Sequence, residues 1–381
     1  MLSLQSFDEY IKLEKLRSTM KKKQSSILSR IAIAQTKKPY IILTLLLLLT
    51  VLFSIPAQDV RTVASLEQMM PRDTTEIASF NTLRDEGLGR DAIAVIIRTN
   101  KDSYVERETI FGEDTKKYVE RLDKELQTQT SITKTQHYLN HEGMVNHDQT
   151  ETLYIAYTDA AADNERMKQL ATYLRELTEE GVPAGTTILL TGTPIIQQTL
   201  GELIQEDQRK TRIASTIFVL LITALLFGFT SSLIPIITVT LSVTWLYGTM
   251  GLLDLPISTL AGGVAAMVIG IGIDFAIHLM NKFKFERKEG LSIPDAIEHA
   301  VMHTGSALSI TALTTGAAFL SFLVGVMPEM GRFGILMALG IFYSLIITLT
   351  ALPALLVIEE QLIKRWAKKA RFGIEKEYKI K

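Results

Sequence analysis

The sequence predicts an α-helical membrane protein with six transmembrane helices and an extracytoplasmic α+β, ferredoxin-like (βαββαβ) domain between helices 1 and 2. Three observations lead to this prediction. Apolar runs recur along the chain, lysine and arginine gather in alternate connections, and one long polar segment alternates strand and helix patterns. Of the 381 residues, 47% are hydrophobic and 21% are charged, which fits a membrane protein with a sizeable water-exposed part.

The apolar runs define the membrane part. A helix needs about 20 apolar residues to cross the hydrocarbon core. The stretches that qualify are 39–55, 213–229, 234–253, 257–280, 304–326 and 333–358. We therefore expect a first membrane segment at 39–56 and a bundle of the other five helices at 211–358. A long polar and basic stretch precedes the first run, so we interpret that run as a retained anchor rather than a cleaved signal.

The positive charges predict the orientation. They cluster in three places: Lys21, Lys22, Lys23, Arg30, Lys37 and Lys38; Lys282, Lys284, Arg287 and Lys288; and Lys364, Arg365, Lys368, Lys369 and Arg371. With six spans these segments fall on one side, which the positive-inside rule makes cytoplasmic. The prediction is a multi-pass protein of the cell membrane with basic cytoplasmic ends at 1–38 and 359–381.

The first segment, 1–38, is patterned as a basic amphipathic helix. Its apolar positions are Leu2, Leu4, Phe7, Ile11, Leu13 and Leu16, set among Lys12, Lys15 and Arg17. Such a helix can lie on membrane lipids as an interfacial anchor. It can equally pack on the base of the bundle, and the sequence does not separate the two interpretations.

The long segment 57–210 carries the α+β pattern. Strands are expected at 91–99, 131–139, 152–159 and 186–192, and helices at 112–128 and 163–180. The helices show apolar faces formed by Tyr118, Leu122 and Leu126, and by Met167, Leu170, Leu174 and Leu177. The order is that of the split βαβ arrangement. A last helix starts at Pro194 and runs directly into the second span.

Asp274 is the candidate functional residue. It is the acidic residue within the spans proper, where an ionisable group costs about 2.5–3.5 kcal/mol. Removal from water favours the neutral carboxyl, so Asp274 can exchange a proton near neutral pH. The structural alternative is an aspartate that hydrogen-bonds a neighbouring helix without titrating.

The histidines have two interpretations each. His278 follows Asp274 by one turn and can relay protons towards the cytoplasm, or it can be a satisfied histidine at the interface. His299 and His303 are also four apart, but no third metal ligand stands out. We predict neither a metal nor a cofactor.

Glycine and threonine residues of the fourth and fifth spans are expected near Asp274. Gly263, Gly270 and Gly272 in the fourth span, and Gly316 in the fifth, allow helices to approach closely and to move. Thr311, Thr314 and Thr315 place hydroxyls on the fifth span that can bond Asp274 or hold water beside it. Generic small-residue packing explains the same pattern.

An ordered set of motifs resembles a known family. The fourth span contains GIGIDFAIHLMNKFKFE (270–286), preceded by MMPRDTTEI (69–77) and TGTPIIQQTLGELIQED (191–207). ITALTTGAAFLSFL (310–323), PEMGRFGILMALGI (328–341) and LPALL (352–356) follow in order. Together, over about 40–358, they resemble the RND superfamily, particularly its MmpL-like and hydrophobe/amphiphile-efflux branches.

The resemblance implies a proton-motive-force-driven exporter with Asp274 as the proton carrier. It also implies that 57–210 is one porter module for a hydrophobic or amphiphilic substrate, drug-like or lipid. Family members usually carry two such halves, whereas this chain has one half and no internal repeat. A homodimer, or pairing with a second RND half, is therefore expected.

Other function classes are weighed against transport. A SecD/SecF-like export factor shares six spans and a glycine-rich fourth helix, and a sterol-sensing-type lipid receptor uses the same six helices. An enzyme is not expected, because the sequence shows no nucleotide loop, nucleophile elbow or paired catalytic carboxylates. The formal net charge of −1 offers no argument for nucleic acid as a partner.

Overall fold

The computed structural model describes residues 28–63, 75, 79, 82, 91–99, 110–141, 143–158, 164–258 and 260–378. The chain divides into two compact units. We call Met1–Arg61 with Asp207–Lys381 the membrane unit, and Thr62–Glu206 the sheet unit. Residues 1–27 and most of the MMPRDTTEI run lie outside the described part.

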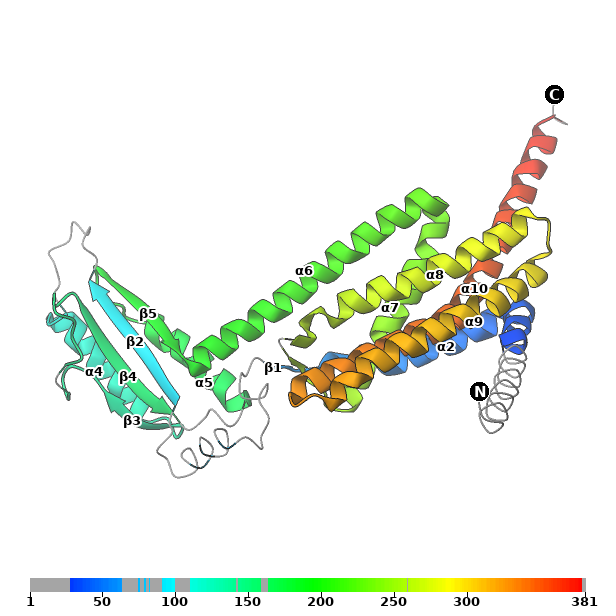
Figure 1. Cartoon of the computed structure of the whole chain (residues 1–381). Helices are drawn as coiled ribbons and strands as arrows, with labels where there is room; N and C mark the ends of the chain where they lie inside the picture. Colours follow the sequence, from blue (N-terminus) through cyan, green and yellow to red (C-terminus); the bar gives the residue numbers. More distant parts are fainter. Residues whose placement is uncertain are drawn as a thin grey trace, which may run out of the picture. The chain divides into compact units, whose positions relative to one another are not determined.

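The membrane unit is built from long apolar helices (Figure 1). Within the described residues, 6 helices are long and apolar enough to cross a membrane. They are α2 (Pro39–Ser54, continued by η1, Pro56–Asp59), α6 (Thr193–Phe227), α7 (Phe229–Leu252), α8 (Val264–Lys288, after η4, Leu260–Gly263), α9 (Ile293–Leu320, followed by η5, Ser321–Val324) and α10 (Pro328–Tyr378). Two short strands, β1 (Thr62–Val63) and β6 (Ile257–Ser258), lie between them in sequence.

Two helices begin at places that differ from the apolar runs. The fourth span was expected from 257, but regular helix starts at Val264, because Pro256 and the adjacent glycines before it disfavour a helix. The fifth was expected from 304, yet α9 starts at Ile293. Ser292 caps it by accepting a hydrogen bond from the Asp295 backbone N–H, and Pro294 suits the first turn.

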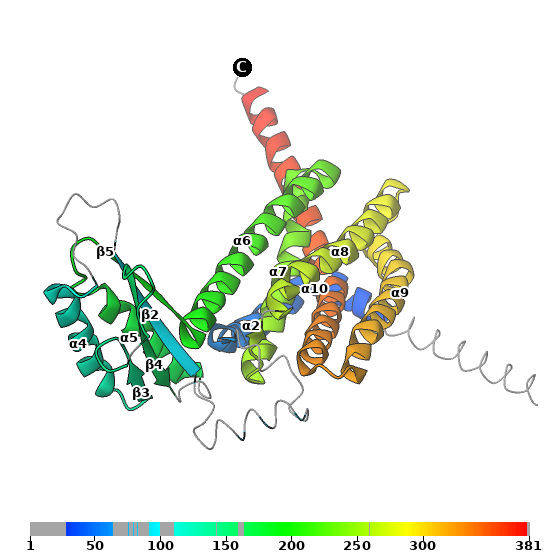
Figure 2. The same ribbon diagram turned by 60° about the vertical axis from the view of Figure 1, so that its left-hand side comes forward.

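The helices α7, α8 and α10 form the centre of the membrane unit. More than half of the residues in their spans are buried, whereas few are buried in α2, α6 and α9. Phe275, Leu279 and Ile341 belong to the largest apolar cluster, which joins α8, α9 and α10. Figures 1 and 2 show these three helices side by side from both directions.

One end of the membrane unit, which we call the basic end, gathers residues 28–38, the connection 289–292 and residues 359–363. Residues 28–37 are helical there, and Leu28 and Ala32 are buried against the bundle. Ser29 donates a hydrogen bond to Glu298 at 2.7 Å, and the buried Gln35 amide donates to the Leu349 carbonyl at 2.6 Å. This part of the N-terminal segment therefore packs on the base of the bundle.

The sheet unit has strand, helix, strand, strand, helix, strand in the expected order. They are β2 (Asp91–Thr99), α4 (Glu113–Gln127), β3 (Ile132–Gln136), β4 (Glu151–Thr158), α5 (Asn164–Glu179) and β5 (Thr186–Gly192). The strands form an antiparallel sheet in the order β3-β4-β2-β5. The buried face of β2 packs on the helix faces identified from their apolar spacing, all of whose residues are buried.

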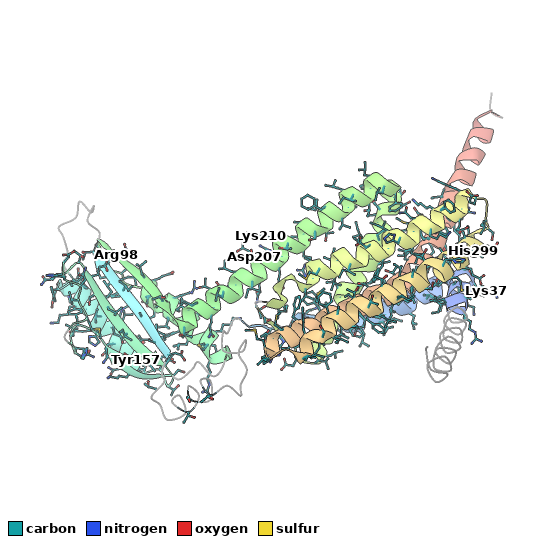
Figure 3. All side chains as sticks on the ribbon, viewed as in Figure 1. Lys37, Arg98, Tyr157, Asp207, Lys210 and His299 are labelled. Atoms are coloured by element: carbon teal, nitrogen blue, oxygen red, sulfur yellow. The ribbon has the colours of Figure 1, made fainter. Side chains whose placement is uncertain are left out.

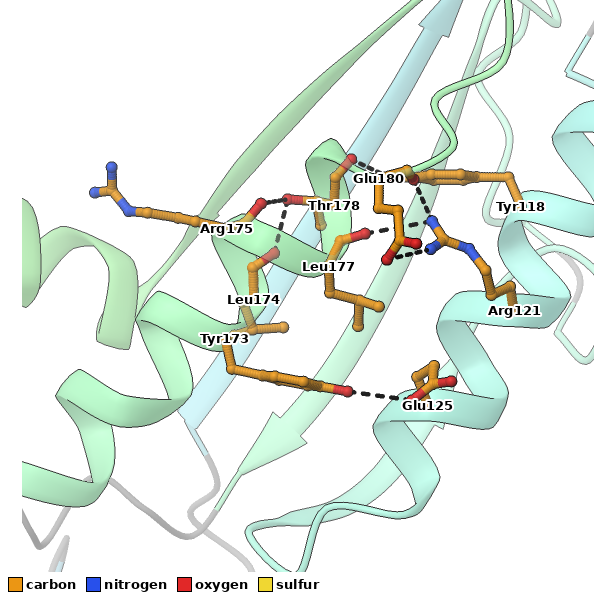
Figure 4. Close-up of polar contacts among 9 residues, drawn as sticks. All are labelled: Tyr118, Arg121, Glu125, Tyr173, Leu174, Arg175, Leu177, Thr178 and Glu180. Atoms are coloured by element: carbon orange, nitrogen blue, oxygen red, sulfur yellow. Dashed lines mark hydrogen bonds and ion pairs between the residues drawn. The ribbon is translucent and has the colours of Figure 1, made fainter.

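Polar contacts clasp α4 to α5 inside the sheet unit (Figure 4). The Tyr118 hydroxyl donates to the Thr178 carbonyl at 2.6 Å, and Arg121 donates to the Leu177 carbonyl at 3.3 Å. Arg121 also pairs with the Glu180 carboxylate at 3.3 Å. Burial raises the pKa of Tyr118 to about 12, with the nearby Arg121 charge acting in the opposite direction. The clasp therefore depends on a neutral tyrosine.

We expect Tyr118→Phe to weaken the sheet unit at neutral pH by about 0.5–1.5 kcal/mol, because one hydrogen bond is lost. A raised pKa means that the stabilisation is complete below about pH 10 and is lost as pH rises through about 12. The variant should therefore lose less stability than the wild type over that alkaline range. Thermal unfolding of the full chain in detergent across this pH range measures both effects, and parallel pH curves would contradict the assignment.

Candidate functional site

One stripe of α8 is left uncovered by the part of the chain that the structure describes. Along η4 and α8, the exposed residues are Gly263, Met267, Gly270, Asp274, His278, Asn281, Phe285 and Lys288. Their spacing of three and four residues places them on one face of the helix. We call this set the α8 stripe. It contains Asp274 and His278, the two ionisable residues singled out from the sequence.

The opposite faces of α8 are packed inside the membrane unit. A Cβ at Gly272 would lie 2.9 Å from Ser344 Oγ on α10 and 3.2 Å from Val239 Cγ2 on α7. Glycine at this position therefore lets three helices meet closely. In contrast, a Cβ at Gly263, Gly270 or Gly316 would meet no described atom within 4 Å. These three glycines do not join helices within the described part of one chain.

Asp274 and His278 stand near the middle of α8, exposed and without a partner. Among the described residues, neither side chain takes part in a hydrogen bond or an ion pair. An uncompensated charge facing hydrocarbon costs about 2.5–3.5 kcal/mol, so such groups normally face a bundle interior or water. The α8 stripe thus places two ionisable side chains on a surface that no described residue of the chain covers.

The expected hydroxyl partners turn towards their own helix. Thr311 donates to the Ala307 carbonyl at 3.2 Å, and Thr314 donates to the Ile310 carbonyl at 3.1 Å. Both threonines are exposed, and Thr315 is half-buried. Their helix α9 packs beside α8. The hydrogen bonds from these hydroxyls to Asp274 that we considered are not present within one chain.

Other ionisable side chains are buried, and reasoning from the sequence did not single them out. Glu286 is only 8% exposed at the basic end of α8, where Lys282 lies 2.7 Å from it. Glu329, at the start of α10, is 2% exposed and pairs with Arg332 at 2.6 Å. The signal for Glu286 was available, because it continues the four-residue spacing of Asp274, His278 and Lys282.

His299 and His303 lie on α9 near the same end, which Figure 3 marks by His299 and Lys37. Their rings are 5.9 Å apart in an edge-to-face arrangement, and His299 Nδ1 is 3.8 Å from the Glu286 carboxylate. Among the described residues, no group of three histidine, cysteine, aspartate or glutamate side chains is arranged to hold a metal ion. These histidines are thus neighbours of a carboxylate rather than part of a described metal cluster.

Comparison with known proteins identifies relatives over most of the chain. The family model described as MMPL matches residues 68–374. A membrane protein of Methanocaldococcus jannaschii, MJ1562, is 32% identical over 374 residues, which covers 89% of this chain and 96% of that protein.

Lipid transporters match over shorter regions. The hopanoid transporter HpnN of Burkholderia multivorans is 35% identical over 24% of this chain and 11% of its own length. The sulfolipid-1 exporter MmpL8 of Mycobacterium tuberculosis is 25% identical over 50% of this chain and 18% of its own length. A crystal structure of SecDF aligns with 88% of this chain and 39% of that one, at 16% identity and a TM-score of 0.46, which is too low to indicate function.

The two classes of glycine on α8 differ in a measurable way. We expect Gly272→Leu to destabilise the membrane unit by roughly 1–3 kcal/mol, because the added side chain overpacks the contact with Ser344 and Val239. The matched variant Gly270→Leu should leave the stability of the dispersed chain unchanged or slightly raised, since leucine favours a helix and the position is open. Thermal unfolding in detergent compares them, and equal losses would contradict the distinction.

Proposed function

Because this chain belongs to the MMPL family, we propose that it is a secondary transporter, driven by the proton-motive force, that exports hydrophobic or amphiphilic molecules such as lipids. In this proposal Asp274 is the proton carrier, and no covalent chemistry on the substrate is involved. His278 and the threonines of α9, Thr311, Thr314 and Thr315, form the polar surroundings through which the proton passes.

The observation that carries this proposal is the unpaired, exposed carboxylate in the middle of α8. Structural ion pairs elsewhere in the membrane unit, such as Arg287 with Glu360 at 3.1 Å, have fixed partners. Asp274 has none among the described side chains, so no fixed counter-charge faces its carboxylate. Protonation removes the penalty for facing hydrocarbon, and it therefore favours whichever arrangement of helices places Asp274 away from water.

The available driving force is sufficient for such a switch. One pH unit across the membrane is worth about 1.4 kcal/mol per proton, and 100 mV of potential is worth about 2.3 kcal/mol per charge. Together they shift a two-state equilibrium by roughly 500-fold. One Asp274 proton per cycle is therefore enough to shift the second arrangement from about 4% to about 96% of the population.

The orientation follows from charge. We place the basic end in the cytoplasm, with both chain ends on that side, because short lysine- and arginine-rich segments stay inside. The sheet unit is then extracytoplasmic and acts as the porter module. The helix α6 begins immediately after β5 and continues as the second membrane helix, so a movement of that span is passed along one continuous helix.

The substrate class is inferred from two sources. The names of HpnN and MmpL8 identify them as a hopanoid transporter and a sulfolipid-1 exporter, although each aligns over only part of its length. Lipids and lipid-like molecules already reside in the bilayer from which an MMPL protein would take them. We therefore assign a hydrophobic or amphiphilic substrate to this chain without choosing among such molecules.

We further propose that a second copy of the chain covers the α8 stripe. Gly263 and Gly270 leave room for the backbone of another helix, and Asp274 lies one turn from Gly270. A two-fold symmetric contact would bring the two Asp274 side chains close to one axis. A separately encoded second half would cover the same surface.

We expect Asp274→Asn to abolish proton-driven transport, because asparagine keeps the shape and cannot carry a proton. Everted vesicles containing the protein are supplied with Nile red or a fluorescent phospholipid, and uptake is followed after a pH gradient is imposed. Uptake by the variant should fall to that of vesicles lacking the protein.

Asp254→Asn is the matched control for this experiment. Asp254 is an exposed acid with a φ of 49°, a conformation that asparagine tolerates, so the substitution removes a charge without strain. Undiminished uptake with Asp274→Asn would eliminate the proton role. Binding of the phospholipid with no uptake by any form would instead indicate a lipid receptor.

The absence of cysteine permits a direct test of the homodimer. We expect Met267→Cys, on the α8 stripe, to form disulfide-linked dimers in native-like lipid, since equivalent positions of two copies meet there. Phe218→Cys, an exposed position on α6, is the control and should stay monomeric on a gel. Cross-linking of Phe218→Cys alone, or of neither variant, would contradict coverage of the stripe by a second copy.

A further inference from the structure

Four ionisable side chains recur at every fourth position along α8: Asp274, His278, Lys282 and Glu286. Each step advances about 6 Å along the helix axis. A four-residue repeat also drifts slowly around the helix, because a turn has about 3.6 residues. Asp274 and His278 are therefore exposed, whereas the Glu286 side chain is only 10% exposed. The row leads from the middle of the membrane to a buried carboxylate at the basic end.

Glu286 is surrounded by groups that can hold or pass a proton. From its own helix, Lys282 Nζ lies 2.7 Å from one carboxylate oxygen. From α9, His299 Nδ1 lies 3.8 Å from the other oxygen, and the ring of His303 packs edge-to-face against that of His299. On α10, Glu360 is held by the Arg287 guanidinium at 3.1 Å. A buried carboxylate with a lysine and an imidazole on its two oxygens is thus kept close to neutral overall.

The helix α9 returns antiparallel to α8 after a short connection. His299 lies at the level of Glu286, so His303 lies one turn farther from the basic end, about level with Lys282. The two histidines therefore lie beside Lys282 and Glu286, the part of the row nearest to the basic end. Both are exposed, which leaves the cluster in contact with water at the basic end.

We propose that Glu286, His299 and His303 form the port through which protons pass between Asp274 and the cytoplasm. This inference rests on the proposed function, in which Asp274 carries the proton. The Asp274 carboxyl gives its proton to water and then to an imidazole nitrogen of His278 or His303. The Glu286 carboxylate accepts it and passes it to His299 and to solvent. Histidine suits this role because its charge changes near neutral pH.

Lys282 sets the charge state of Glu286 between proton transfers. The ammonium group next to the carboxylate offsets the cost of its burial and keeps the carboxylate ionised, ready to accept a proton. The steps of about 6 Å along the row are longer than a hydrogen bond, so single waters complete the path. Glu286 therefore affects the rate of proton exchange, whereas Asp274 remains the proton carrier.

The test uses the full chain in sealed vesicles of known orientation, with the pH of each side set independently. The probe is dicyclohexylcarbodiimide, which modifies protonated carboxyl groups in apolar surroundings, and mass spectrometry measures the modified Asp274 peptide. In the wild type, modification should decline rapidly when pH is raised on the cytoplasmic side. In Glu286→Gln the same decline should be at least about tenfold slower, a rise in the barrier of about 1.4 kcal/mol.

Controls separate a proton role from a structural one. Glu289→Gln removes an exposed acid three residues away and should respond as fast as the wild type. Imidazole added on the cytoplasmic side should restore the speed of Glu286→Gln, because a small mobile base replaces the missing group. Slow exchange without rescue by imidazole indicates a structural role and overturns the proposal, as does an unchanged speed in Glu286→Gln.

A second variant covers the case in which Glu286→Gln does not fold. The double substitution His299→Gln and His303→Gln alters two exposed side chains and should slow exchange in the same way, with rescue by imidazole. Normal speed in this variant overturns the port. If modification of wild-type Asp274 ignores the pH on both sides, the proton-carrier function itself fails. A normal pH response at Asp274 with no effect of Glu286 removes only the port.

Discussion

Hydrocarbon does not solvate a carboxylate, and the arrangement of the membrane unit is best understood from that constraint. Around α8, apolar side chains such as Phe275 and Leu279 fill one side, and they pack with α9 and α10. Charges at the ends of the spans are paired, as in Arg332 with Glu329. Asp274 alone among these features has neither a partner nor an apolar cover in the described part of the chain. The exposed face of α8 is therefore the face on which this carboxylate has to find water or a partner.

The glycines of the fourth span fall into two groups, one inside the bundle and one on the exposed face of α8. Gly272 points into the bundle, where Ser344 and Val239 leave no room for a larger residue. Gly270, two positions earlier, points out of it. One helix therefore carries a glycine that is packed against two other helices of the bundle and a glycine that no described atom would crowd within 4 Å. In the proposed homodimer, the first glycine serves the fold of one copy and the second serves the contact between copies.

The sequence alone was sufficient for much of the fold. Apolar length identified the spans, and the faces through Tyr118 and Met167 identified the buried sides of α4 and α5, because their spacing matches the helix period. The beginning of α9 was missed, since Asp295 and Glu298 interrupt the apolar run although Ser292 caps a helix there. In a membrane span both faces are apolar, so hydropathy did not reveal which face Asp274 occupies. The histidine beside Glu286 comes from α9, and no spacing within α8 could have shown it.

The length of α6 has a mechanical consequence. Its 35 residues, Thr193–Phe227, form one uninterrupted rod of about 52 Å, well beyond the roughly 30 Å of a hydrocarbon core. A tilt of about 10° sweeps one tip through roughly 9 Å relative to the other. A crossing of the hydrocarbon uses only about 20 residues of this helix, so roughly 15 of its residues remain for water and the headgroup region.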